Sequence, residues 1–229
     1  MENKKESLKK NILVVAPHPD DETLGCGGSL LKHNDTGDNL YWLIMTSMHN
    51  SNNWTKKQKK IRENEIEKVA KIYNFKKIIK LNHITAELDK IPLNLLISQT
   101  GKEISKIKPN TIYIPYVGDI HTDHQITNQV MQACIKSFRY PSIKKVLMYE
   151  TISETNFNFV NRRLFVPNTF IEITKYINKK IKIMNIYKSE IHSHPFPRSE
   201  VSIQSLSYLR GSQCGVKSAE AFELIYNKL

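Results

Sequence analysis

The segment that follows the apolar run 12–15 combines a histidine with three carboxylates. His18, Asp20, Asp21 and Glu22 fall within five positions of the stretch APHPDDETLGCGG. Imidazole nitrogens and carboxylate oxygens bind divalent metal ions, and a carboxylate can also act as a general base. One acid could cap the following helix, but capping leaves the histidine and the second acid unexplained. The cluster therefore predicts a metal site with a base beside it.

A second cluster, HTDH, has a similar composition. His18 and Asp21 are three residues apart, as are His121 and His124. Side chains at i and i+3 of a helical turn can point to one side. If the two pairs meet, they supply His, Asp and His to one cation and leave a coordination position for water, as in catalytic zinc sites. The alternative for the second pair is a surface turn capped by Asp123.

Apolar runs and amphipathic segments alternate along the chain, and they must position both clusters. We expect strands at 11–16, 39–46, 76–81, 111–116 and about 144–150. We expect helices at 21–33, 55–74, 92–107, 122–138, 174–190 and 215–228. This alternation predicts a single α/β domain over 1–229, with a flexible segment at 1–10. Its sheet should be open, mostly parallel and Rossmann-like, with helices on both faces and the chemistry at the carboxyl ends of the strands.

Composition limits the classes of protein. No apolar run reaches the roughly 18 residues that a membrane span needs, and the basic start lacks a cleavable apolar segment. Cys26, Cys134 and Cys214 are isolated, which fits a reducing compartment, so we expect a cytoplasmic protein. The formal charge of +12 indicates either an anionic partner or drift toward a composition rich in Lys, Asn and Ile.

The two clusters together resemble a known family. APHPDDETLGCGG is similar to the AHPDDE-type signature of the PIG-L/LmbE family of zinc-dependent N-acetylglucosaminyl deacetylases, and HTDH resembles its second motif, usually HPDH. IRENE (61–65), FVPNTFIEI (165–173) and LRGSQCGVKSAEAFE (209–223) are similar to further segments of the family. The resemblance covers nearly the whole chain. Thr122 replaces the usual proline, and the region around 81–83 lacks the acid expected after that strand.

The resemblance implies a role for each residue of the motifs. The metal, zinc or alternatively iron(II), would be held by His18, Asp21 and His124. Asp20 would be the general base, and His121 would stabilise the oxyanion and protonate the leaving amine. Asp123 could hold His121 in the right tautomer and keep it cationic. The implied reaction is hydrolysis of the N-acetyl group of an amino sugar by a metal-activated water.

Four other residues are candidates for substrate binding. The family's helix motif places Arg62 on the sugar pocket, although an exposed helical ion pair is the alternative. Arg198 and Arg210 could contact substrate or phosphate, or could form structural ion pairs. Asp119 could contact substrate or could simply make its turn.

Several substrates and two rival functions are compatible with these residues. The resemblance favours a nucleotide- or lipid-linked amino sugar of surface glycans, with an N-acetylglucosamine conjugate of thiol-cofactor synthesis as the runner-up. A non-haem iron oxygenase also uses two histidines and one carboxylate, and His18-Pro-Asp20 has its H-x-D spacing, but such enzymes are rich in β structure. A basic protein that binds nucleic acid or anionic lipid would need no water-activating acid. We expect neither nucleic-acid binding nor stable membrane insertion, and uncovered sheet edges leave self-association open.

Overall fold

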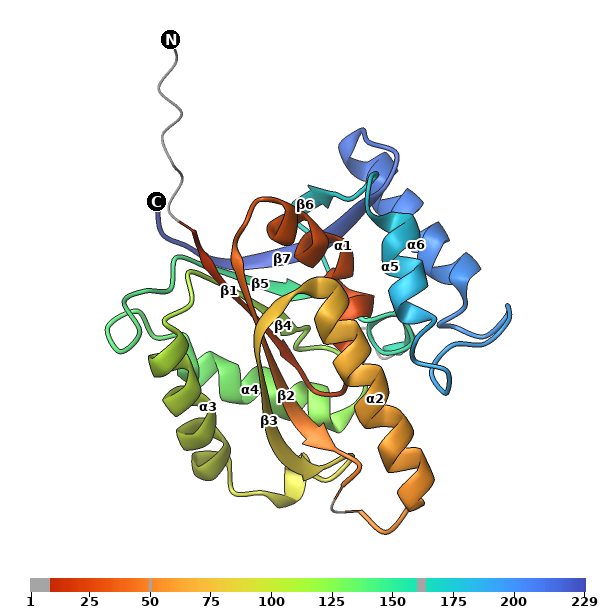
Figure 1. Cartoon of the computed structure of the whole chain (residues 1–229). Helices are drawn as coiled ribbons and strands as arrows, with labels where there is room; N and C mark the ends of the chain where they lie inside the picture. Colours follow the sequence, from red (N-terminus) through yellow and green to blue (C-terminus); the bar gives the residue numbers. More distant parts are fainter. Residues whose placement is uncertain (1–8, 50, 160–163) are drawn as a thin grey trace.

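The computed structural model of this chain describes residues 9–49, 51–159 and 164–229. Its centre is a seven-stranded sheet in the order β3-β2-β1-β4-β5-β7-β6 (Figure 1). The strands are β1 (Asn11–Ala16), β2 (Asn39–Ser47), β3 (Phe75–Ile84), β4 (Thr111–Pro115), β5 (Lys145–Tyr149), β6 (Thr169–Glu172) and β7 (Ala219–Asn227). The helices are α1 (Asp21–Asp35), α2 (Lys56–Tyr73), α3 (Leu93–Ile107), α4 (Thr122–Cys134), α5 (Ile177–Met184) and α6 (Glu200–Cys214). Of the segment expected to be flexible, residues 1–8 lie outside the described ranges.

The strand order reverses between β1 and β4. β1 pairs in parallel with both β2 and β4, and the parallel pairing continues from β2 to β3 and from β4 to β5. β7 pairs in antiparallel fashion with both β5 and β6. The prediction of an open, mostly parallel α/β sheet is therefore confirmed. Both chemical clusters follow the two strands that flank the reversal, which is where such sheets form their crevice.

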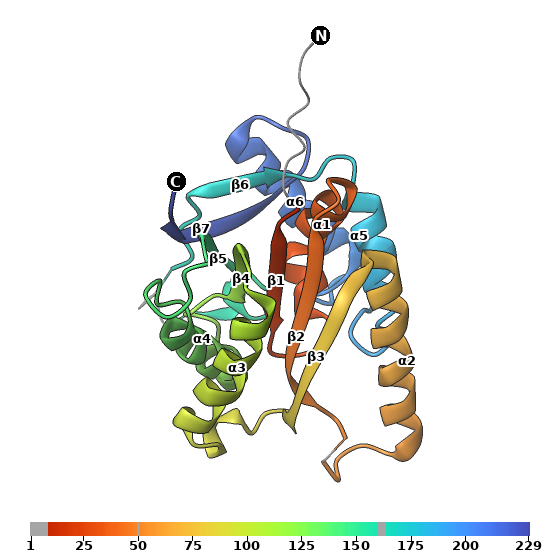
Figure 2. The same ribbon diagram turned by 60° about the vertical axis from the view of Figure 1, so that its left-hand side comes forward.

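Helices cover both faces of the sheet (Figure 2). Along β1, Ile12 and Val14 pack in one apolar cluster with residues of α1, α2, α5 and α6. Leu13 and Val15 pack in the other cluster, with residues of α3 and α4. Because successive side chains of a strand point to opposite faces, a strand covered on both sides must be apolar throughout. The run 12–15 is therefore buried core, and the polar residues begin only where the strand ends.

Helix α1 approaches the end of the sheet closely. A Cβ atom placed on Gly25 would lie 2.1 Å from Cδ2 of Tyr149 on β5. The Tyr149 hydroxyl donates a hydrogen bond to the carbonyl of Val15 on β1, at 2.9 Å. Glycine is therefore required at position 25, because a larger residue would push the first turn of α1 away from the strand end.

The prediction for the C-terminal region is wrong in part. Residues 215–228, expected to be helical, contain strand β7. The helix is α6, which ends at Cys214 and is capped by Gly215 with φ of 76°. Ala219, Ala221 and Phe222 are buried where β7 lies between β5 and β6. Tertiary pairing with β5 decides the conformation of this segment, because its apolar residues fit helical spacing as well as strand alternation.

Candidate active site

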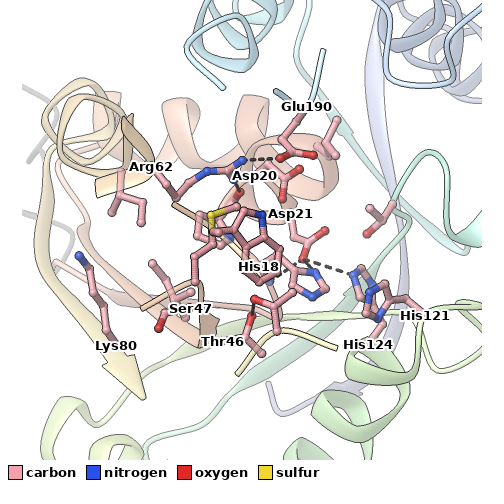
Figure 3. Close-up of a pocket in the computed structure, with 18 of the residues that line it drawn as sticks. His18, Asp20, Asp21, Thr46, Ser47, Arg62, Lys80, His121, His124 and Glu190 are labelled. Atoms are coloured by element: carbon pink, nitrogen blue, oxygen red, sulfur yellow. Dashed lines mark hydrogen bonds and ion pairs between the residues drawn. The ribbon is translucent and has the colours of Figure 1, made fainter. Parts of the chain in front are cut away.

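The turn after β1 carries the first cluster. The carbonyl of Pro17 accepts hydrogen bonds from the backbone N–H and the hydroxyl of Thr46, at 3.1 and 2.8 Å, which fixes the turn to β2. Asp20 has φ of 137° and ψ of −30°, a conformation that L residues rarely adopt. Because the backbone turns sharply there, the two adjacent carboxylates lie apart: Asp21 faces the histidines, and Asp20 lies toward Glu190 (Figure 3).

Three side chains from two distant segments converge on one point. Oδ2 of Asp21 lies 3.3 Å from Nδ1 of His18 and 3.3 Å from Nε2 of His124. One ligand atom of each residue lies within 4.8 Å of the other two. The structure thus brings together the His, Asp and His that the spacing of the two motifs suggested. Two imidazole nitrogens and one carboxylate oxygen are the donor set of a catalytic zinc-type site, so this group can hold a divalent ion.

Each of the two imidazoles is oriented by a buried carboxylate. Nε2 of His18 lies 3.0 Å from Oδ2 of Asp123, and Nδ1 of His124 lies 2.8 Å from Oδ2 of Asp119. Both acids are fully buried. A carboxylate at the far nitrogen holds the ring proton there and leaves the near nitrogen free to bind a metal. The donor set therefore fits a metal ion in its orientation as well as in its chemistry.

These contacts correct two expectations. Asp123 does not orient His121 with its carboxylate, which is occupied by His18 and by two backbone N–H groups of the 86–88 turn, at 2.7 and 3.1 Å. Asp119 does not face the substrate side, because its other oxygen accepts a hydrogen bond from the Thr155 hydroxyl at 2.5 Å. Both acids orient the imidazoles of His18 and His124 instead.

The pKa values of His18, Asp21 and His124 are shifted by their burial and by one another. Burial would raise the pKa of Asp21, but the two imidazoles outweigh burial and hold it below its usual range. Burial disfavours charge on His18, yet hydrogen bonds to Asp123 and Asp21 raise its pKa to about 9. The pKa of His124 also lies well above its ordinary value, because Asp21 and Asp119 outweigh its burial. Protons and a metal ion compete for these nitrogens, so binding of a metal releases protons.

The surroundings of His121 favour its neutral form. Its Nδ1 accepts a hydrogen bond from the backbone N–H of Asp123 at 3.1 Å, so the ring proton of the neutral form resides on Nε2. Burial and the neighbouring rings of His18 and His124 lower the pKa of His121 to about 4. These effects oppose the cationic form of His121 that we expected. The ring lines the cavity as a neutral hydrogen-bond donor.

Asp20 is the carboxylate that stays free for proton transfer. It lines the cavity, is 7% exposed and makes no capping hydrogen bond to α1. Burial, Asp21 and Glu190 raise its pKa well above the ordinary value, and Arg62 and Arg198 oppose this shift. A raised pKa makes the ionised carboxylate a stronger base. Asp20 and Asp21 are neighbours in sequence, but their surroundings push their pKa values in opposite directions.

A cavity of about 260 Å³ opens over these residues. In Figure 3, His121 and His124 lie at one end of it and Lys80 at the other, with Thr46 and Ser47 between them. Pockets for small ligands commonly measure roughly 300–1,000 Å³, so this cavity suits a small polar molecule.

Two of the predicted substrate residues, Arg62 and Arg198, line the cavity. Arg62 donates to the carbonyl of Pro19 at 2.8 Å and forms an ion pair with Glu190. Nη2 of Arg198 lies 3.1 Å from the second carboxylate oxygen of Glu190, and Nη1 donates to Ser153 at 2.9 Å. Glu190 thus joins the two guanidinium groups on the cavity wall. Sequence reasoning missed Glu190, because nothing in YKSE marks it as the partner of a residue 128 positions away.

Arg210 lies outside this cavity, so its prediction as a substrate residue is wrong. Its Nε and Nη2 donate to the two carboxylate oxygens of Glu150 at 2.7 and 2.6 Å. Paired oxygens of one carboxylate satisfy the planar guanidinium and fix its position. The structure thus shows the alternative considered for Arg210, a structural ion pair with Glu150.

The rival functions lose support. Within the described part of the chain, the groups that could hold a metal contain Asp21 or Asp123 and not Asp20, so the H-x-D spacing is not used. The α/β sheet also differs from the β-rich scaffold of the oxygenases. Among the described residues, no helix combines the length and apolar character that crossing a bilayer requires.

Comparison with known proteins identifies the family. Residues 13–135, which include both motifs, match the family model PIG-L, described as GlcNAc-PI de-N-acetylase. The chain belongs to this family.

Individual relatives agree with this assignment. Diacetylchitobiose deacetylase of Thermococcus kodakarensis is 24% identical over 94% of this chain and 83% of its own length. A probable N-acetyl-alpha-D-glucosaminyl L-malate deacetylase of Bacillus anthracis is 22% identical over 80% of this chain and 82% of its own length. The structure of N,N'-diacetylchitobiose deacetylase from Pyrococcus horikoshii superposes with a TM-score of 0.76 at 22% identity, over 95% of this chain and 84% of that one. The last likeness concerns the fold.

Proposed function

We propose that this protein is a metal-dependent hydrolase that removes the N-acetyl group from an amino-sugar substrate. The observation that carries the proposal is the arrangement on one cavity wall of a three-donor metal group, a free carboxylate and a neutral imidazole N–H. Membership of a de-N-acetylase family supports it, as do relatives named for deacetylating N-acetylated sugars.

His18, Asp21 and His124 would hold the metal, for which we propose Zn²⁺, with Fe²⁺ as the alternative in a reducing environment. A divalent ion held there would lower the pKa of a bound water to about 7 and would polarise a carbonyl group. The three cysteines are free thiols, which supports our placing the protein in the cytoplasm.

Asp20 moves the proton. As the water oxygen adds to the amide carbon, the Asp20 carboxylate accepts a proton from that water. The same carboxyl group then passes the proton to the amide nitrogen, the C–N bond breaks, and acetate and a free amine result. General base catalysis of this kind contributes about 10²- to 10⁴-fold to the rate.

His121 stabilises the charge that develops on the former carbonyl oxygen. Its Nε2–H is the group that the hydrogen bond at Nδ1 leaves available. A donor already fixed in position costs little reorganisation when the charge appears. We therefore propose His121 as an oxyanion donor in its neutral form, and we assign protonation of the leaving amine, which the family resemblance gave to His121, to Asp20. Arg62 and Arg198, held by Glu190, would bind the sugar hydroxyls.

The test is acetate release from a panel of N-acetylated sugars by protein loaded with zinc or with iron(II). The panel includes N-acetylglucosamine, diacetylchitobiose and N-acetylglucosaminyl malate, the last representing thiol-cofactor synthesis. We expect release that depends on added metal and disappears with a chelator. Metal-loaded, folded protein that releases no acetate from any amino sugar would contradict the proposal.

A further inference from the structure

The cavity has a second end that the hydrolytic residues leave unused. It is formed by residues after β2, on α2 and on β3: His49, Lys59, Glu63 and Lys80 line the cavity and contact one another there. Figure 3 shows Lys80 at the opposite side of the cavity from His121 and His124. A substrate whose amide lies beside Asp20 would extend its remaining part toward these residues.

Positive charge is in excess at this end. Lys80 forms an ion pair with Glu63, and the same carboxylate lies 3.0 Å from Nε2 of His49. Lys59 donates to the backbone carbonyl of His49 at 2.9 Å. Within the described ranges, Lys59 has no carboxylate partner. Among the described residues, the ammonium group of Lys80 is thus paired with a carboxylate, whereas that of Lys59 is not.

We propose that this end of the cavity binds a phosphoryl group carried by the amino-sugar substrate; the inference rests on the proposed function. A phosphate ester brings one to two negative charges and several acceptor oxygens, which match ammonium groups that act as point charges. Lys59 supplies the uncompensated charge, and Lys80 can share its remaining N–H donors between Glu63 and the phosphate. A neutral sugar would leave the excess charge unmatched.

The phosphoryl group could belong to a sugar monophosphate or to a nucleoside-diphosphate sugar. Both present the same oxygens to the lysines. Trp54 also lines the cavity, and its indole offers a surface on which a base can stack. A preference for the nucleotide form that is lost in Trp54→Ala identifies the second source.

The experiment compares the metal-loaded enzyme on N-acetylglucosamine, its 1-phosphate, its 6-phosphate and UDP-N-acetylglucosamine. We expect kcat/KM to be at least about tenfold higher for one phosphorylated substrate than for the neutral sugar, and to fall with added salt, because ionic contacts are screened. Lys59→Ala should remove most of this preference through KM. Lys59→Arg should retain it, and Lys60→Ala, at the exposed neighbouring position, should not change it.

A binding measurement separates this inference from the proposed function. Isothermal titration of the same four compounds into the metal-loaded Asp20→Asn variant reports affinity without turnover. Tighter binding of a phosphorylated compound that Lys59→Ala weakens supports the inference, even if no acetate is released. Equal binding of neutral and phosphorylated sugars, or equal effects of Lys59→Ala and Lys60→Ala, overturns it and leaves deacetylation standing where acetate is released.

Discussion

The ammonium group of Lys180 on α5 lies 2.7 Å from Oε1 of Glu220 on β7, and both residues are 5% exposed. The pair joins the two halves of α1, which is interrupted at Cys26. Lys180 donates to the carbonyl of Leu24 at 2.8 Å, before the interruption. The carboxylate of Glu220 accepts the backbone N–H groups of 28 and 29 at 2.8 Å, after it.

Removal of one member of this pair should destabilise the protein strongly. Glu220→Ala leaves a buried ammonium unpaired and two backbone N–H groups without an acceptor. We expect the free energy of unfolding to fall by about 3 to 5 kcal/mol, measured by urea unfolding. The double variant Lys180→Met, Glu220→Leu should recover part of the loss, since it removes the buried charges together. A small loss, under about 1 kcal/mol, in the single variant would show that water reaches the pair.

Asp20→Asn should keep the metal and lose the activity. The amide cannot accept the proton, and Asp20 makes no capping bond that the change would break. We expect kcat to fall about 10²- to 10⁴-fold, with one metal per chain by elemental analysis. Loss of the metal in this variant, with activity retained in Asp21→Asn, would show that the two roles are reversed.

Asp119→Asn should weaken metal binding without preventing it. The carboxylate that fixes the Nδ1 proton of His124 becomes a neutral amide, which lowers the basicity of the ring. Affinity for the metal should fall about 10- to 100-fold in a chelator competition. The matched control is Asp89→Asn, an exposed acid on the one-turn helix Leu88–Lys90, which should not change it. Equal affinities in the two variants would contradict the orienting role of Asp119.

His33 should make stability depend on pH. Its Nδ1 lies 2.8 Å from Asp38 and its Nε2 lies 3.0 Å from the hydroxyl of Tyr113. Burial lowers the pKa of His33 although Asp38 opposes the shift. As the pH falls, His33 of the unfolded chain is therefore protonated first, at about pH 6.5, and His33 of the folded protein only at a lower pH. The stability that neutral His33 provides is complete above about pH 6.5 and is lost as the pH falls from there through the folded-state pKa.

The measurement for His33 is urea unfolding at pH 7.5 and pH 5. His33→Gln removes the titrating group, so its stability should fall less between these values than that of the wild type. His83→Gln is the control, because His83 lies on β3 and its ring bonds Gln99 rather than Asp38 or Tyr113. An unchanged pH slope in His33→Gln would refute the assignment.

The sequence was sufficient for the parts of the structure that depend on local pattern. Residues 12–16 of the first strand are an unbroken apolar run, and the polar residues that follow it mark its carboxyl end, so the place of the first motif could be predicted. The residues 121–124 follow the apolar strand at 111–115 in the same way. Parallel strands bring such ends together, and the structure places His18, Asp21 and His124 side by side.

The partners of these residues could not be predicted, because they depend on contacts between distant segments. Asp123 is two positions from His121, yet its carboxylate bonds His18, which lies 105 positions away. Arg210 is near a motif-like segment, but its charge is used by Glu150. The C-terminal strand depends on β5 as its neighbour, and its own residues permit a helix. Local pattern predicts where along an element a polar residue lies. Tertiary packing decides which partner its side chain faces.

The hydrogen-bonded register between β1 and β4 runs from Ile12 opposite Thr111 to Val14 opposite Tyr113, whereas the register between β1 and β2 continues to Ala16. Beyond Val14 the two halves of the sheet are no longer joined by this ladder, and the metal ligands come from both halves. An ion held by His18, Asp21 and His124 would thus act as a cross-link between segments that the backbone leaves separate. Chelation should then accelerate amide hydrogen exchange at the ends of both strands. The metal ion would thus stabilise the sheet as well as supply chemistry.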